Sequence, residues 1–341
     1  MVANNFHKTI IALLIILPLF ASAQLLPSYL TAGDVTIHLS PESPGANQTV
    51  KATLEGLGVD LDRSKISWFV NGKLEKASVG EKSFILKTGA IGASVNLIVT
   101  IETIDGAKIN NTVTITPAEV SLIWEPISYV PPFYKGKRLY SYGAPIKVIA
   151  IPEIIKNGER FGDNELVYKW KVDYKLIQSA SGAGKNTITA KSSVPLKPTT
   201  ISVEVSTLDG AVSAFGTITA QPQAPMVAFY ENNPRLGILF NKELSNATTL
   251  TEQEINLFAI PYFFDSATAA DPKLNFVWQM NNQTVSPGDE NNQITLRQVE
   301  NNAGTANVAL RINHLKDIFQ YAAKSLNIEF GKKTDNNFFG F

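Results

Sequence analysis

Residues 66–72 read Ile-Ser-Trp-Phe-Val-Asn-Gly, and two later stretches repeat their pattern. Residues 168–174 read Tyr-Lys-Trp-Lys-Val-Asp-Tyr, and residues 276–282 read Phe-Val-Trp-Gln-Met-Asn-Asn. Their tryptophans, at positions 68, 170 and 278, are 102 and 108 residues apart. Each is followed 10 to 12 residues later by a glycine and then by a stretch that alternates between apolar and polar side chains. Recurrence at this length indicates three copies of one domain-sized unit.

Strict alternation is the period of a half-buried β-strand, and it recurs throughout the chain. It is clearest at residues 95–101, 201–205 and 308–312. The nearest approach to a helical pattern is residues 318–326, which fit either a short helix or the approach to a last strand. Asp105-Gly106 and Asp209-Gly210 predict hairpin turns of type I′, and Lys316-Asp317 takes their place in the third copy.

We therefore predict an all-β fold of three tandem immunoglobulin-like β-sandwich modules, at residues 34–118, 119–222 and 225–334. Proline and small polar residues gather at both boundaries, at 116–118 and 221–225. Each copy has the size and strand count of an immunoglobulin-like sandwich. The repeated tryptophan then lies on the strand that this fold buries between its sheets. Trp68, Trp170 and Trp278 are the predicted structural core residues.

The first 23 residues have the pattern of a secretory signal peptide. Lys8 precedes an apolar run at residues 10–20, and Ala21-Ser22-Ala23 forms a cleavage site. Eleven apolar residues span about half of a bilayer core. We expect cleavage, a linker at residues 24–33, no transmembrane helix in the mature chain, and a secreted or cell-surface protein.

Composition limits the chemistry of the chain. Thirty basic and 30 acidic side chains balance, which argues against nucleic acid as a partner. The chain has no cysteine, which excludes disulfides, thiol catalysis and cysteine-ligated metals. An apolar content of 44% is that of a folded protein. The cores must therefore be held by packing alone.

The tryptophan signature, the Asp-Gly turns and the proline-marked joints resemble tandem immunoglobulin-like or PKD-like modules of bacterial surface proteins. Residues 124–152 are similar to uncharacterised secreted proteins of candidate-phylum, Parcubacteria-like bacteria. PKD modules carry a W-x-F-G-D-G stretch, whereas Trp68 here is followed by Phe-Val-Asn-Gly. The resemblance therefore implies an immunoglobulin-like fold and a surface location.

We predict no catalytic residue, no bound cofactor and no enzyme activity. After residue 23 the chain has two histidines, His38 and His314, in the first and last modules, where zinc would need three or four clustered ligands. Calcium is the most plausible ion, at Asp60 and Asp62 or at Asp289 and Glu290, although solvated loop carboxylates are the favoured interpretation of these acids.

One segment, residues 129–142, combines aromatic and basic side chains. It is either a buttress between modules, since the third copy has a similar lead-in, or a patch that binds a glycan or a partner protein. The candidate residues are Tyr129, Phe133, Tyr134, Lys135, Lys137, Arg138, Tyr140 and Tyr142.

A second candidate follows the last strand, in an aromatic C-terminal tail at residues 335–341. Phe338, Phe339 and Phe341 either fold back on the third sandwich, stay solvated, or dock on a neighbouring subunit's sheet edge or a membrane surface.

Together these features predict a noncatalytic structural or adhesive rod at the cell surface. Its partners would be other surface proteins, further copies of itself, or glycans. The alternatives are a carbohydrate- or peptide-binding module protein, or an accessory component of a secreted enzyme, pilus or surface-layer assembly.

Overall fold

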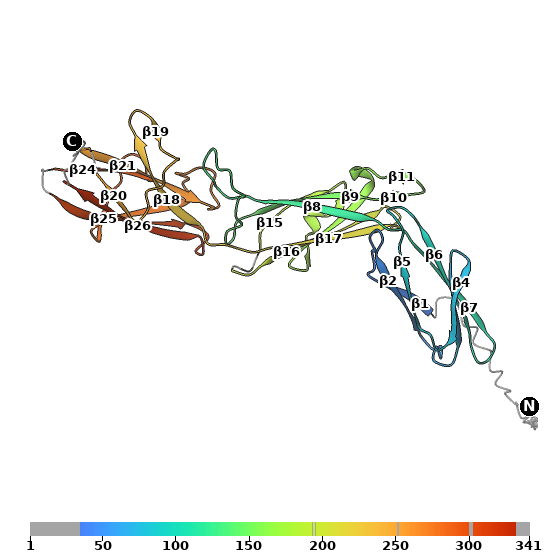
Figure 1. Cartoon of the computed structure of the whole chain (residues 1–341). Coiled ribbons are helices and arrows are strands. Elements are labelled where there is room, and N and C mark those ends of the chain that lie inside the picture. Colours follow the sequence, from blue (N-terminus) through green and yellow to red (C-terminus); the bar gives the residue numbers. More distant parts are fainter. Residues whose placement is uncertain (1–34, 193, 195, 251, 300–302, 332–341) are drawn as a thin grey trace, which may run out of the picture.

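The computed structural model describes residues 35–192, 194, 196–250, 252–299 and 303–331. Three β-sandwiches follow one another in a row, and the first is tilted against the other two (Figure 1). The predicted signal peptide, the linker at 24–33 and the aromatic tail lie outside the described residues. Among the described residues, no helix has the length and apolar composition that crossing a membrane requires.

Module 1 contains seven strands in two antiparallel sheets, ordered β1-β2-β5 and β4-β3-β6-β7. This order, with the first, second and fifth strands facing the other four, is that of a seven-stranded immunoglobulin-like sandwich. The strands are β1 (Val35–Ser40), β2 (Thr49–Gly56), β3 (Lys65–Val70), β4 (Lys73–Val79), β5 (Ser83–Lys87), β6 (Val95–Glu102) and β7 (Lys108–Ile115).

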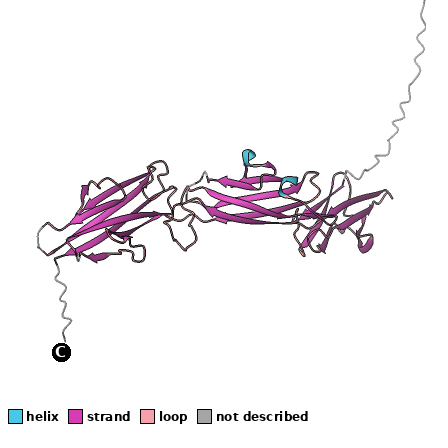
Figure 2. Cartoon of the chain, turned by 90° about the horizontal axis from the view of Figure 1, so that it is seen from above, coloured by secondary structure: helices cyan, strands magenta, loops and turns pink. Residues whose placement is uncertain are grey.

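Module 2 repeats this order as β8-β9-β15 against β13-β12-β16-β17, and β14 also pairs with β12. The strands are β8 (Glu119–Pro126), β9 (Ile146–Glu153), β10 (Ile155–Lys156), β11 (Glu159–Arg160), β12 (Leu166–Val172), β13 (Lys175–Leu176), β14 (Gly182–Ala183), β15 (Thr187–Ala190), β16 (Thr199–Thr207) and β17 (Ser213–Ala220). Two short 3₁₀ helices on this module, η2 (Asp163–Glu165) and η3 (Gln178–Ala180), are the helices that Figure 2 shows.

Module 3 has the same core order with two added edge strands, as β19-β18-β21-β24 and β20-β26-β25-β22-β23. Strand β20 pairs in parallel with β26, and the other pairings are antiparallel. The strands are β18 (Met226–Asn233), β19 (Gly237–Ile238), β20 (Ala247–Thr249), β21 (Glu254–Tyr262), β22 (Leu274–Met280), β23 (Gln283–Val285), β24 (Gln293–Arg297), β25 (Gly304–His314) and β26 (Tyr321–Phe330).

The predicted fold class is confirmed: the chain is all-β, with three tandem immunoglobulin-like sandwiches. The exact module boundaries stay a proposal. Strand β7 ends at Ile115 and β8 begins at Glu119, while β17 ends at Ala220 and β18 begins at Met226. The open choice at residues 318–326 resolves to a strand, because β26 pairs with β25 along ten residues.

Each core tryptophan lies on the equivalent strand of its module, β3, β12 or β22, and each is fully buried. Its indole Nε1 donates a hydrogen bond to a main-chain carbonyl in the segment that precedes the fifth core strand. The acceptors are the carbonyl oxygens of Glu81 at 3.1 Å, Lys185 at 2.8 Å and Asn291 at 2.8 Å. A buried indole N–H needs such a partner. The tryptophan therefore connects the two sheets both by packing and by a hydrogen bond.

The residues just after each tryptophan strand form a tight turn in which two successive residues have positive φ, as a type I′ turn requires. The pairs are Asn71-Gly72, Asp173-Tyr174 and Asn281-Asn282. The side chain of the first residue accepts a hydrogen bond from a main-chain N–H on the neighbouring strand, at 2.9–3.0 Å. The donors are Asn96, Thr200 and Asn307. The Asn or Asp of the repeated signature therefore fixes the register of two strands.

The prediction of type I′ geometry for the Asp-Gly turns was wrong. Positive φ occurs at Gly106 and Gly210 but not at the preceding aspartates. The Asp209 carboxylate instead accepts a bond from the Thr207 hydroxyl at 2.6 Å, and Asp105 bonds Thr103 in the same way. Each loop has a single left-handed residue, the glycine at its end. This is the geometry of a hairpin loop that is longer than the two-residue type I′ turn.

The first joint differs from a loose proline-containing linker. Pro117 and Ala118 are buried. The Pro117 carbonyl accepts a bond from Gly92 N–H at 2.9 Å, and the Ala118 N–H bonds the Pro44 carbonyl at 3.3 Å. These bonds hold the linker against module 1. Two further bonds cross the joint: the Ala46 N–H donates to Glu119 Oε1 at 3.1 Å, and the Ser43 and Ser213 hydroxyls share a bond of 2.7 Å.

Tyr174 gives a test of the repeated turn, because it occupies the position at which module 1 has Gly72. Its φ of +67° is costly for a side chain of this size, and the side chain is 86% exposed. Relief of the left-handed strain should stabilise the folded module by about 1–2 kcal/mol. The greater entropy of glycine in the unfolded chain should destabilise the module by about 0.5–1 kcal/mol. We expect Tyr174→Gly to raise the free energy of unfolding of module 2 by about 0.5–1 kcal/mol in urea titrations.

Tyr321→Gly is the matched control, since Tyr321 is also exposed but lies in the extended strand β26. That substitution should destabilise module 3. A destabilisation by Tyr174→Gly of similar size would contradict the assignment of strain to the turn.

Candidate functional site at the second joint

The segment between β8 and β9 reaches from module 2 onto the surface of module 3. Two main-chain hydrogen bonds join the modules: Tyr129 N–H to the Phe264 carbonyl at 2.8 Å, and Phe263 N–H to the Tyr129 carbonyl at 2.7 Å. Such reciprocal bonds have the pattern of a strand pair. The backbone of the segment is thus attached to module 3 independently of its side chains.

An apolar cluster surrounds these bonds. Tyr129 and Val130 pack against a patch on module 3 that contains Ala228, Tyr230, Ile260, Tyr262 and Phe263. The Tyr134 ring meets the rings of Tyr262 and Phe263 edge-on, at centroid distances of 5.8 and 5.9 Å. Edge-to-face pairs at this distance are favourable beyond the area that they bury. The cluster is a small interdomain core.

Burial keeps the hydroxyls of Tyr129 and Tyr262 protonated near neutral pH. The Tyr230 and Tyr262 hydroxyls share a hydrogen bond of 2.8 Å. Burial raises the pKa of Tyr262 well above its ordinary value, and the bond to Tyr230 adds to the effect. Burial also raises the pKa of Tyr129. These groups therefore act as packing and hydrogen-bonding side chains and not as acids or bases near neutral pH.

The eight residues predicted from sequence divide into two groups. Tyr129 and Tyr134 contact module 3. Tyr140 is buried in the core of module 2, where its hydroxyl bonds the Thr199 hydroxyl at 2.8 Å, and Tyr142 is half-buried. Phe133, Lys135, Lys137 and Arg138 are exposed. The role of these residues as a ligand patch stays a prediction.

A groove of about 820 Å³ runs along the exposed side. Its walls come from β8, from residues 129–138 and from a loop of module 3 at residues 267–269. Trp124, which sequence analysis did not select, lies in this groove with the Lys137 ammonium 4.4 Å from its ring centroid. Arg138 Nε lies 3.3 Å from Glu125. The groove thus combines an aromatic wall with one carboxylate and two cations.

Phe133 is an aromatic residue with almost no cover. Its side chain is 90% exposed, and its backbone has a φ of +66°. A left-handed conformation is costly for an aromatic residue, and such strain is concentrated at functional positions. No packing in the described structure accounts for the placement of this ring.

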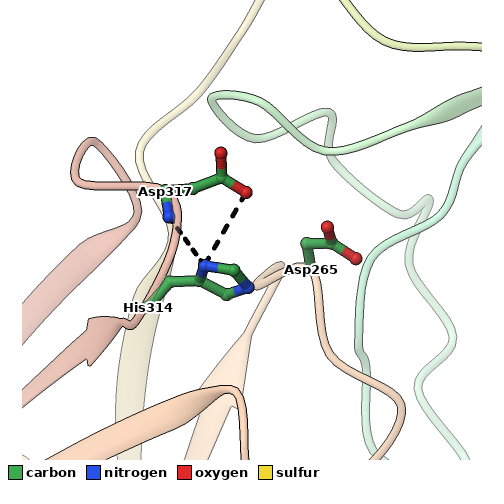
Figure 3. A group of neighbouring side chains, drawn as sticks. All are labelled: Asp265, His314 and Asp317. Atoms are coloured by element: carbon green, nitrogen blue, oxygen red, sulfur yellow. Dashed lines mark hydrogen bonds and ion pairs between the residues drawn. The ribbon is translucent and has the colours of Figure 1, made fainter.

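A separate polar cluster lies at the same joint and contains Asp265, His314 and Asp317 (Figure 3). One potential ligand atom from each lies within 4.8 Å of the others, which makes this the candidate metal group among the described residues. His314 ends β25 and is 5% exposed, Asp317 follows in the next turn, and Asp265 follows β21.

The hydrogen bonds of His314 explain the cluster without an ion. Its Nδ1 accepts bonds from the main-chain N–H groups of Lys316 at 3.2 Å and Asp317 at 2.9 Å. A neutral imidazole with an accepting Nδ1 has its proton on Nε2, so neither nitrogen has a lone pair free for a cation. In the repeat, His314 also replaces Thr103 and Thr207, whose hydroxyls stabilise the equivalent turns.

The two carboxylates already have cationic partners. Lys191 of module 2 lies 3.1 and 2.9 Å from the two Asp317 oxygens, and Lys273 lies 3.5 Å from Asp265. Nearby, burial opposes ionisation of Asp271, but N–H bonds from Ala267 and Lys273 outweigh it and lower its pKa. The Lys191–Asp317 pair makes the cluster a further contact between modules. Because it joins residues 126 positions apart, sequence reasoning had no signal for it.

The acids considered for calcium are not gathered into a site. Asp60 pairs with Arg63 at 2.6 Å, and the hydrogen bond from this side chain lowers the pKa of Asp60. Asp62 pairs with Lys82 at 2.9 Å. Asp289 and Glu290 lie in an exposed loop of another module.

The chain is similar to several solved structures. No protein-family model and no curated protein matches it. The three N-terminal domains of the bacteriophage RB49 highly immunogenic outer capsid protein (Hoc) are 12% identical; the match covers 87% of this chain and 97% of that one, with a TM-score of 0.26. Fibronectin(III)-like modules of Clostridium thermocellum CbhA are 16% identical, covering 55% and 94%, with a TM-score of 0.27.

A third solved structure is SGBP-B from the Bacteroides ovatus mixed-linkage glucan utilization locus, in complex with a mixed-linkage heptasaccharide. It is 14% identical, and the match covers 84% of this chain and 64% of that one, with a TM-score of 0.21. The fold assignment itself rests on the strand order of each sandwich.

His314 provides a test of the cluster. His314→Ala removes the acceptor of two main-chain N–H groups, and leaving a buried donor unpaired costs about 1–3 kcal/mol. We expect a loss of that size in the free energy of unfolding of module 3. His314→Asn retains an acceptor near the Nδ1 position and should lose less than half as much. Added zinc chloride should leave the wild-type melting temperature unchanged, and a zinc-dependent rise that His314→Ala abolishes would contradict this structural role.

Proposed function

We propose that the protein is a noncatalytic structural or adhesive protein of the cell surface or extracellular space, built as a rod of three immunoglobulin-like modules. The observation that carries this proposal is the second joint. Two main-chain hydrogen bonds, an apolar cluster and the Lys191–Asp317 ion pair connect modules 2 and 3 there. Flexibly linked domains usually meet through smaller and more polar contacts. A stiff joint suits a protein that holds its distal module at a distance.

The chemistry of the groove supports a noncatalytic role. Its lining contains one carboxylate, Glu125, which is paired with Arg138. Glycoside hydrolysis generally requires two carboxyl groups on either side of the bond that is cleaved. Burial raises the pKa values of Tyr129 and Tyr262, so these two hydroxyls stay protonated near neutral pH and cannot accept a proton from a substrate. The groove is better suited to holding a ligand than to reacting with it.

Secretion belongs to the same proposal and is supported by the signal-peptide pattern of residues 1–23. The resemblance to surface proteins of candidate-phylum bacteria is likewise part of the proposal, and so are the predicted module boundaries.

Fractionation of native cells tests whether the protein is secreted or held at the cell surface. An antibody against module 3 should label intact cells, and immunoblots should find the chain in the surface or extracellular fraction with its first 23 residues removed. Protein retained inside the cell at full length would contradict the proposal.

Phe133 favours a second candidate function, the binding of a carbohydrate or peptide in the groove. Aromatic rings bind sugar faces and apolar side chains, and an exposed ring in strained backbone is suited to that use. Lys137 and Arg138 add hydrogen-bond donors nearby. Whatever binds there would contact both modules.

A glycan and peptide array with the mature chain tests this candidate. We expect Phe133→Ser to reduce binding at least tenfold, because the ring supplies the exposed apolar surface. Tyr174→Ser is the matched control, since Tyr174 is similarly exposed but lies away from the groove. Equal binding by wild type and Phe133→Ser would rule out the groove.

A further inference from the structure

Module 3 has an open apolar pocket at the end away from module 2. It has a volume of about 490 Å³, within the range of ligand pockets. It lies between the edge strand β24, the β22–β23 turn and the ends of β25 and β26. Apolar side chains make up much of its lining: Leu250, Met280, Leu296, Val299, Ile328 and Phe330.

The pocket is a continuation of the core. Leu296 and Phe330 are partly buried and pack against the core cluster of module 3. Val299 is 91% exposed at the rim. The Phe330 ring lies against Gly304, where a Cβ atom would come within 2.8 Å of its Cζ. The ring is thus held by the backbone at the wall of the pocket.

The strand that ends at this pocket is followed in the sequence by an apolar segment. Phe330 is the last residue of β26, and the chain continues from it as Gly331, Lys-Lys-Thr-Asp-Asn-Asn and then Phe338-Phe339-Gly340-Phe341. Seven residues separate Phe330 from Phe338, and the eight Cα–Cα steps from one to the other span about 26–29 Å when extended. Gly331 has a φ of +71°, a turn conformation at the point where the chain leaves the strand.

We propose that Phe338, Phe339 and Phe341 of the same chain pack into this pocket. The pocket is apolar, and the sequence places three aromatic side chains among four residues after a polar spacer. Attachment through a spacer of this length gives an effective concentration in the millimolar range. The chain's own segment therefore occupies the pocket in preference to the same segment of another molecule in dilute solution.

The test uses the mature chain, a truncated chain that lacks residues 336–341, and a fluorescent peptide of residues 332–341. Fluorescence anisotropy should show saturable binding of the peptide to the truncated chain. Its apparent affinity for the full chain should be at least tenfold weaker, because the chain's own segment competes. A peptide with all three phenylalanines replaced by serine should not bind.

Val299→Asp in the truncated chain tests the location of binding. It places a charge at the pocket rim without disturbing the core, and it should weaken peptide binding at least tenfold. Val79→Asp, on an exposed strand of module 1, is the matched control and should have no effect. Equal weakening by both variants would overturn the assignment to this pocket.

Three other outcomes would overturn the proposal. Equal binding of the peptide to full and truncated chains would show that the chain's own segment does not occupy the pocket. A dimer formed by the full chain but not by the truncated chain, measured by light scattering, would assign the segment to a second copy. Binding of the peptide to lipid vesicles and not to the truncated chain would assign it to a membrane surface.

Discussion

The hydrogen bond from a buried indole to a main-chain carbonyl is the interaction on which each sandwich depends. In all three modules the tryptophan lies on the same strand, is fully buried, and bonds a carbonyl 13 to 15 residues further along the chain. Immunoglobulin domains with cysteines hold their sheets together at this level with a disulfide. This chain has no cysteine, so the tryptophan provides both the bulk and the link between the sheets.

Once the three cores are closed, the connections between them determine what the molecule can do. The long segment between β8 and β9 lies outside the module 2 core, and its tyrosines cover an apolar patch on module 3 that would otherwise face water. The same segment carries the exposed Phe133 and forms one wall of the groove. The joint and the proposed ligand groove are therefore linked physically, because one stretch of chain provides both the contact with module 3 and the groove wall.

The sequence predicted the modules well because strand alternation and the repeated tryptophan are local signals that survive without any knowledge of contacts. It failed where geometry depends on the register of paired strands: the Asp-Gly loops are longer than type I′ turns, and the true type I′ turns follow the tryptophan strands. It also missed the groove, since Trp124 and Lys137 approach each other only after β8 and the following loop fold together. The role of His314 depends on two N–H groups of a turn, and no residue pattern shows those.

The central claim is that modules 2 and 3 form one rigid body through residues 129–142. Because the chain has no cysteine, spin labels can be attached specifically to Thr219→Cys on β17 and Ser325→Cys on β26, both at exposed strand positions. Pulsed electron paramagnetic resonance then measures the distribution of distances between the two modules. The structure predicts a single narrow distribution that broadens when Tyr134 and Lys191 are both replaced by alanine. A broad distribution in the otherwise unmodified chain would contradict the claim.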